Sequence, residues 1–159
     1  MASGSRGLEL RVPPLLVVLV AAAAMAGITR VAPMFDVAIA AGWRSALAAL
    51  LLALGIGFAV AGVVAFRRAN TTVDPIRPDA ASALVAVGVY RVSRNPMYVG
   101  FVLALAAWAV WLANALAVVV LPLFVAYLDR FQIVPEERAL GARFGASYDA
   151  YLRRVRRWL

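Results

Sequence analysis

The sequence predicts an all-α membrane protein that crosses the bilayer about four times, and three observations support this fold class. First, 65% of the 159 residues are hydrophobic and 15% are charged, whereas roughly half of a soluble domain is apolar and about a quarter is charged. Second, the apolar residues form runs that approach or exceed the roughly 20 residues of a transmembrane helix. Third, the arginines lie between these runs. We therefore expect residues 1–159 to form one integral membrane domain.

The first transmembrane helix is predicted over about Val12 to Thr29. Arg6 and Arg11 precede this run, and Ala22–Ala24 offers the small residues of a signal-peptide cleavage site. Because the run continues past these alanines, we interpret it as a membrane helix rather than a secretory signal.

The second transmembrane helix is predicted over Trp43 to Phe66, after a short loop from Arg30 to Gly42. Residues 1–66 would thus supply two N-terminal helices. The second run carries Gly55, Gly57 and Gly62. Small residues let membrane helices approach closely, and glycine as neutral filling explains them equally well, so both interpretations stay open.

Residues 67–95 form the longest polar connection, and Pro75 and Pro78 make its first part extended or turning. Its apolar stretch, residues 81–90, is expected to lie on the membrane surface or in the core of the domain. A connection of this length in a compact domain is usually functional.

The third apolar run, Pro96 to Phe131, predicts a helical hairpin. A single helix of this length would extend about 54 Å at 1.5 Å per residue, well beyond a hydrocarbon core of about 30 Å. Two antiparallel helices that turn at Ala113–Asn114 fit better.

The tail beyond Phe131 carries apolar residues at spacings of three and four, which indicate one face of an amphipathic helix or of two helices broken near Gly145. The opposite face carries arginines, so the pattern alone is typical of an interfacial helix on anionic lipid. The apolar positions are Leu140, Phe144, Tyr148, Tyr151, Val155 and Trp158.

The arginines predict the orientation of the chain. With both termini on one side, fourteen of the sixteen basic residues lie there, and only Arg30 and Arg44 flank the opposite loop. The positive-inside rule then places both termini in the cytoplasm. An alanine-rich chain whose basic residues are all arginine is typical of GC-rich bacteria, so we expect the bacterial inner membrane. A nucleic-acid-binding protein would instead carry its charges as a stripe on a soluble face.

Two residue types that dominate enzyme chemistry are missing, since the chain has no cysteine and no histidine. Disulfides, thiolate metal sites and a cysteine nucleophile are thereby excluded. The commonest general base and metal ligand is also absent. We accordingly predict no metal site.

Two polar clusters are candidates for chemistry. Arg94 and Asn95-Pro96 open the third apolar run, between Tyr90 and Tyr98. Asparagine is a good N-cap and proline is favoured at the first helical position, while the tyrosines suit a membrane interface. A structural role therefore explains this cluster as well as a chemical one does.

The second cluster is Glu136-Glu137 after Pro135, where two carboxylates in the first turn of a helix would favour its dipole. Both clusters are expected at the same depth, at opposite ends of the hairpin. A cationic and an anionic group held beside a mostly apolar cavity would suit a zwitterionic amphiphile.

These residues are familiar as an ordered set: G-V-Y-R-x-x-R-N-P-M-Y-x-G over residues 88–100, E-E-R-x-L over 136–140 and F-G-x-x-Y-x-x-Y over 144–151. The stretch from Thr71 to Leu159 resembles the isoprenylcysteine carboxyl methyltransferase and phospholipid methyltransferase family of integral membrane enzymes. The resemblance implies a methyltransferase core over residues 67–159. It also implies S-adenosylmethionine as methyl donor and a lipophilic acceptor from the bilayer, such as an isoprenoid or isoprenylcysteine-like carboxylate, a small thiol or a phospholipid amine.

Carried over by position, the resemblance implies Arg94 as the catalytic residue and a set of cofactor contacts. Eukaryotic members usually have histidine where this chain has asparagine, which forms hydrogen bonds but does not titrate. We expect one glutamate to hold the amine or ribose hydroxyls of the cofactor, and the arginine to pair with a carboxylate. The implied contacts are Ser82, Ala83, Leu84, Val85, Tyr90, Asn95, Pro96, Met97, Tyr98, Glu136 and Glu137.

Two other functions stay open at this point. One is an NADPH-dependent reductase of the steroid 5α-reductase type, although no phosphate-binding glycine loop is visible. The other is a non-enzymatic membrane scaffold or transporter subunit. A soluble-type methyltransferase is excluded, because the chain has no βαβ alternation.

Overall fold

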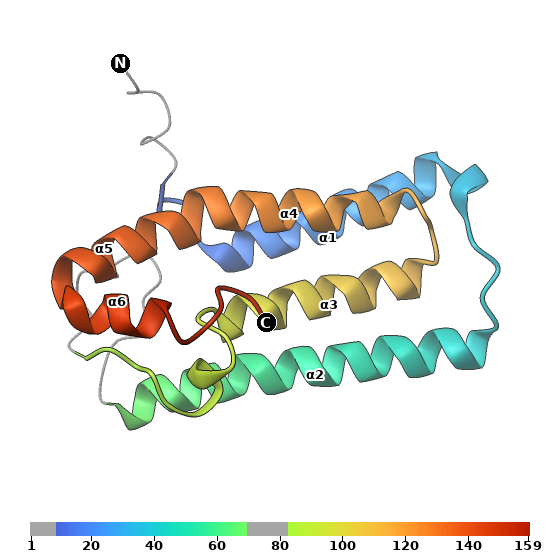
Figure 1. Ribbon diagram of the computed structural model, residues 1–159. Coiled ribbons are helices and arrows are strands. Elements are labelled where there is room, and N and C mark those ends of the chain that lie inside the picture. Colours follow the sequence, from blue (N-terminus) through green and yellow to red (C-terminus); the bar gives the residue numbers. More distant parts are fainter. Residues whose placement is uncertain (1–8, 70–82) are drawn as a thin grey trace, which may run out of the picture.

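The computed structural model describes residues 9–69 and 83–159, and within these ranges every regular element is a helix. The long helices run side by side with alternating direction (Figure 1). They are α1 (Pro14–Val31), α2 (Ala41–Arg68), α3 (Pro96–Leu112), and a continuous rod made of η4 (Ala117–Val119), α4 (Val120–Leu128), the π-turn η5 (Asp129–Ile133) and α5 (Val134–Phe144).

Three of these helices are long and apolar enough to cross a membrane, namely Pro14–Val31, Ala41–Arg68 and Ala117–Phe144. The remaining one, α3, is equally apolar but has only 17 residues. The predicted all-α polytopic membrane protein is confirmed, with a fourth helix that is shorter than the others. Large exposed side chains such as Leu19, Leu50, Leu54 and Ile56 cover α1 and α2, as a surface facing lipid requires.

The turn of the hairpin lies where the sequence predicts it. Ala113 ends α3 in the left-handed region at φ 52°. The amide of Asn114 donates to Asp36 Oδ1 at 2.8 Å and to the Ala32 carbonyl at 3.0 Å. Its Oδ1 accepts from the backbone N–H groups of the next turn, residues 116 and 117. A buried asparagine in an apolar run is thus fully used, and it ties the hairpin to the loop after α1.

Two glycines allow α2 and α3 to approach closely. A Cβ on Gly100 would lie 2.6 Å from the Gly55 carbonyl, and a Cβ on Gly62 would lie 2.8 Å from Met97 Cγ. Nothing lies within 4 Å of a Cβ on Gly57. The close-packing interpretation therefore holds for Gly55 and Gly62, and the neutral one for Gly57.

The main core lies among α1, α3 and α4, where Met25, Leu105 and Leu128 are fully buried. Trp108 Nε1 donates to the Ala22 carbonyl at 3.1 Å and joins α3 to α1. A smaller cluster joins the end of α2 to the segment before α3 through Ala65, Val85 and Tyr90. The part of the 81–90 stretch that the structure describes thus contributes to the core of the domain.

The tail breaks at Gly145, which adopts φ 47°, and α6 (Ala146–Leu152) folds back along α5 (Figure 1). Tyr148 and Tyr151 on its apolar face are 3% and 4% exposed. Tyr151 Oη donates to the Tyr90 carbonyl at 2.8 Å. The expectation that this face lies on lipid was wrong, because the short connection at Gly145 turns it toward the protein's own η3 segment (Gly88–Arg91).

Candidate active site

The two polar clusters meet at one end of the bundle, which we call the arginine-rich end. The segment η3 and the start of α3 come from one side, and α5 with the last residues of the chain comes from the other (Figure 1). Pro96 occupies the first helical position of α3, as predicted. One turn of helix then places Tyr98 toward α5.

Tyr98 and Glu136 form the first contact between the clusters. The Tyr98 hydroxyl donates a hydrogen bond to Glu136 Oε1, and Tyr98 is only 5% exposed. Glu136 does not begin a helix, since the backbone enters α5 through the continuous turn of η5. The predicted stabilisation by a helix dipole is therefore wrong, and the carboxylate obtains its hydrogen bond from a side chain instead.

Glu137 forms the second contact and is held by two arginines. Arg94 Nη2 lies 3.3 Å from Glu137 Oε1. Arg157 reaches the same carboxylate with both sides of its fork, Nη2 to Oε2 at 2.7 Å and Nε to Oε1 at 3.1 Å. Arg157 Nη1 also lies 3.6 Å from Asp129 Oδ1. Two parallel charge-assisted hydrogen bonds fix the direction of a carboxylate as well as its distance.

The end of the chain lies across the corner formed by Arg94 and Asn95. Asn95 Nδ2 donates to the Arg157 carbonyl at 2.9 Å, and the Arg94 N–H donates to the Arg156 carbonyl at 3.0 Å. Asn95 occupies the N-cap position of α3, but its side chain makes no capping hydrogen bond. The predicted side-chain cap is therefore wrong, because the amide is used to hold the chain terminus. Ser93, fully buried, accepts from the Asn95 N–H at 3.1 Å.

Two buried tyrosines complete the site and act as neutral donors. Burial raises the pKa of Tyr151 to about 12 and also raises the pKa of Tyr90. Both hydroxyls therefore stay protonated at neutral pH. A Cβ on Gly62 would lie 3.6 Å from the Tyr90 hydroxyl, so the bare backbone of α2 makes room for this ring beside Met97.

The structure brings together most of the residues that the sequence predicts for the site. Arg94, Asn95, Pro96, Met97, Tyr98, Glu136, Glu137 and Tyr90 all lie at the arginine-rich end. Val85 joins them through its cluster with Tyr90 and Ala65. Ala83 and Leu84 are half-buried just upstream, and Ser82 lies outside the described residues.

Sequence reasoning missed Arg157 and Ser93. Arg157 is one of four arginines among the last seven residues, and no spacing rule distinguishes it from its neighbours. Ser93 carries no signal beyond its place between Arg91 and Arg94. Only the return of the chain through α6 shows that these two residues touch the corner before α3.

The polar groups of this site fit a zwitterionic ligand. Within the described part of the chain, Arg94 Nε is buried without a hydrogen-bond partner. A buried donor left unpaired is costly, and an anionic acceptor would satisfy it. The carboxylate of Glu136, on the neighbouring position of α5, offers the complementary acceptor for hydroxyl or ammonium groups. No three His, Cys, Asp or Glu side chains gather as a metal site would require in residues 9–69 and 83–159.

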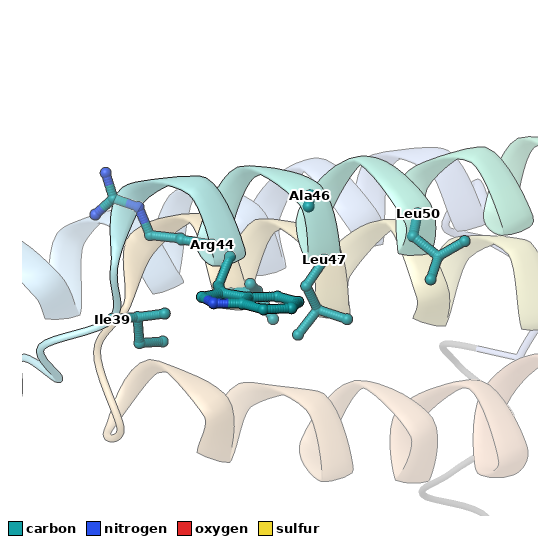
Figure 2. Close-up of a pocket in the computed structure, with 7 residues that line it drawn as sticks. Ile39, Arg44, Ala46, Leu47 and Leu50 are labelled. Atoms are coloured by element: carbon teal, nitrogen blue, oxygen red, sulfur yellow. The ribbon is translucent and has the colours of Figure 1, made fainter.

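A separate hollow of about 320 Å³ lies at the opposite end of α2 (Figure 2). Its lining is almost entirely apolar, and the guanidinium of Arg44 lies over the ring of Trp111, 5.3 Å from the centroid. This hollow is not part of the candidate active site. It is lined by Ile39, Trp43, Arg44, Ala46, Leu47, Leu50 and Val110.

Comparison with known proteins agrees with this arrangement. Residues 43–147, from the first turn of α2 to the start of α6, match the family model described as phospholipid methyltransferase. An uncharacterized protein of Haemophilus influenzae is 43% identical over 63 residues, which are 40% of this chain and the whole of that protein. Protein-S-isoprenylcysteine O-methyltransferase B of Arabidopsis thaliana is 28% identical over 113 residues, which are 71% of this chain and 57% of the plant protein.

No solved structure matches the chain. The family model nevertheless covers most of the described bundle, including the corner at Arg94 and both glutamates of α5. The chain belongs to the phospholipid methyltransferase family.

Proposed function

We propose that this membrane protein transfers the methyl group of S-adenosylmethionine to a lipophilic acceptor drawn from the bilayer. The observation that carries the proposal is the contact between the two family motifs, in which Tyr98 binds Glu136 while Arg94 and Arg157 share Glu137. Family membership supports the type of reaction. The relative from Arabidopsis, named for methylation of isoprenylcysteine, supports an acceptor with an apolar chain.

The residues present would hold the charged parts of the cofactor. Arg94 has a buried Nε without a partner in the described chain, and it would pair with the carboxylate of the cofactor. Glu136, oriented by Tyr98, would accept hydrogen bonds from the amine or the ribose hydroxyls. When bound, S-adenosylmethionine supplies a methyl group on a cationic sulfur, which is already an activated leaving group.

The protein's own groups act by placement rather than by proton transfer. The chain has no histidine, and the Asn95 amide is used as a donor to the Arg157 carbonyl. The acceptor must therefore bring its own lone pair, as a carboxylate, a thiolate or an unprotonated amine does. Alignment of two reactants can supply a large part of a barrier reduction. A site that excludes water also favours a step in which opposite charges neutralise.

We further propose that the arginine-rich end faces the cytoplasm of a bacterium and that both termini lie there. In the described chain, Arg30 and Arg44 alone flank the loop at the other end, and the positive-inside rule then sets this orientation. The acceptor would reach the site from the inner leaflet, and the surrounding partners would be membrane lipids.

The test is calorimetric titration of the detergent-solubilised protein with S-adenosylmethionine. We expect saturable binding that weakens about tenfold or more in Glu136→Gln and in Arg94→Ala, as loss of a charge-assisted hydrogen bond implies. Arg67→Ala, which changes an exposed arginine at the end of α2, serves as the matched control. Unchanged affinity in both site variants, or binding of NADPH in place of the sulfonium cofactor, would remove the proposal.

The acceptor is then identified with the wild-type protein. Lipid extract is incubated with protein and methyl-labelled S-adenosylmethionine, and labelled products are analysed by mass spectrometry. A labelled ester, thioether or amine would define the acceptor class. A protein that binds the cofactor but labels no lipophilic compound would contradict the assignment of a lipid-soluble acceptor.

A further inference from the structure

The N-terminal segment before α1, residues 9–13, lies against the π-turn of the helical rod, and we call this segment the strap. In Figure 1 the strap is the dark blue segment beside the junction of α4 and α5. The Leu10 N–H donates to the Phe131 carbonyl at 3.1 Å. Gln132 Nε2 donates to the Val12 carbonyl at 2.7 Å. Two backbone groups of the strap are therefore bonded to residues of η5.

A pair of ion pairs adds to these bonds. Glu9 Oε1 lies 2.9 Å from Arg130 Nη1, and Glu9 Oε2 lies 2.5 Å from Arg138 Nη2. Arg130 belongs to η5 and Arg138 to α5. One carboxylate thus bridges the π-turn and the helix that follows it, on either side of Glu136 and Glu137.

The sequence explains why this turn needs support. Pro135 has no N–H, so the Phe131 carbonyl, four residues earlier, cannot accept the usual hydrogen bond of an α-helix. The proline ring also crowds that carbonyl, which favours a widened turn. The Leu10 N–H supplies a donor to the same carbonyl. The strap thereby replaces a hydrogen bond that the proline removes.

The π-turn determines which way the two glutamates point. Each residue of an α-helix adds about 100° of rotation, so one extra residue in the turn rotates everything after it by about that angle. With the π-turn in place, Glu136 meets Tyr98 on α3, and Glu137 meets Arg94. In a regular helix both carboxylates would point elsewhere. π-turns are rare and occur frequently at functional sites.

We infer that Glu9 is a positioning residue, which clamps the π-turn through Arg130 and Arg138 and thereby directs Glu136 and Glu137 into the site. The inference rests on the proposed function of that site. It gives the N-terminal strap, which contacts no cofactor-binding residue in the interactions described above, a defined effect on cofactor affinity.

The experiment compares three variants in the full-length protein in detergent. Glu9→Gln removes the clamp charge, and Glu9→Arg combined with Arg138→Glu restores one ion pair with opposite polarity. Arg11→Gln is the matched control, because it changes an exposed charge on the same strap. Each variant is measured by hydrogen–deuterium exchange and by equilibrium binding of S-adenosylmethionine.

For Glu9→Gln we expect about fivefold faster exchange over residues 129–137, in keeping with the loss of two partly exposed ion pairs. Exchange over residues 153–158 should rise as well, because Glu137 holds that segment through Arg157. Cofactor affinity should fall about fivefold with little change in melting temperature. The charge-swapped pair should recover most of both effects relative to Glu9→Arg alone, and Arg11→Gln should match the wild type.

Wild-type exchange and affinity in Glu9→Gln would overturn the inference, as would equal defects in Arg11→Gln. A melting temperature that falls without faster exchange at residues 129–137 would also overturn it, since this outcome indicates only a general loss of stability. If the wild type binds no S-adenosylmethionine, the proposed function fails, while the exchange measurements still decide whether Glu9 holds the π-turn and the glutamates.

Discussion

Arg157 offers a sharp test of how the site is assembled, through the variant Arg157→Ala. The substitution removes both arms of the fork that binds Glu137, at 2.7 and 3.1 Å, and leaves Arg94 as the remaining partner at 3.3 Å. The backbone carbonyl of Arg157 is unaffected, so Asn95 still donates to it. The tail is therefore expected to loosen rather than detach.

The magnitude follows from the exposure of the pair. The side chains of Arg157 and Glu137 are 36% and 19% exposed, which lies between a surface pair worth up to about 1 kcal/mol and a buried pair whose disruption costs about 3–5 kcal/mol. We expect a loss of about 1–2 kcal/mol after discounting for solvent screening. For a chain of this size, that loss corresponds to a decrease in melting temperature of about 2–8 °C.

The assay combines thermal unfolding with limited trypsin digestion, since the tail offers several arginines as cleavage sites. Arg153→Ala, which changes an exposed arginine in the same tail, is the matched control. Arg157→Ala should melt earlier and lose its last residues faster than Arg153→Ala. If the two variants unfold and cleave alike, the fork on Glu137 does not hold the tail, and the reasoning is refuted.

Three further predictions concern the other contacts. Tyr98→Phe removes the donor to Glu136 and should weaken S-adenosylmethionine binding about tenfold in calorimetry, as loss of a hydrogen bond to a charged group implies; wild-type affinity would contradict the contact. Gly100→Ala places a Cβ 2.6 Å from a backbone carbonyl of α2 and should cost about 1–3 kcal/mol, measured as a lower melting temperature than that of Gly57→Ala; equal temperatures would contradict the close crossing. The hydrogen bond from Arg130, with that from Arg138, lowers the pKa of Glu9 below its usual 4.5, so the clamp persists above that value and is lost as the pH falls through the lowered pKa; a spin label on the strap of this cysteine-free chain should become mobile only below about pH 4.5, and mobility already at neutral pH would contradict the clamp.

Much of the fold could be predicted from the sequence because its signals are local. Apolar runs set α1 and α2 to within two residues of the structure, and Asn114 marks the hairpin turn by its polarity alone. Gly145, the expected break in the tail, adopts the positive φ that glycine permits. The site residues before α3 and on α5 were also predictable, since each carries a polar group next to an apolar span.

The remaining features depend on contacts between distant segments. The side chain of Asn95 could cap a helix or bind another chain segment, and only the return of the tail decides for the Arg157 carbonyl. Glu136 and Glu137 look like residues of a helix start, and the π-turn that joins α4 to α5 depends partly on the strap far away in sequence. The buried face of α6 could equally have faced lipid, because apolar periodicity does not distinguish a protein surface from a membrane.

The central claim is that the corner before α3 and the glutamates of α5 together bind S-adenosylmethionine. The most direct measurement is hydrogen–deuterium exchange of the whole protein in detergent with and without this cofactor. We predict that added S-adenosylmethionine slows exchange in peptides covering residues 90–99 and 134–139, with the hollow near Trp43 unchanged. Protection confined to other segments, or no protection at saturating cofactor, would contradict the account.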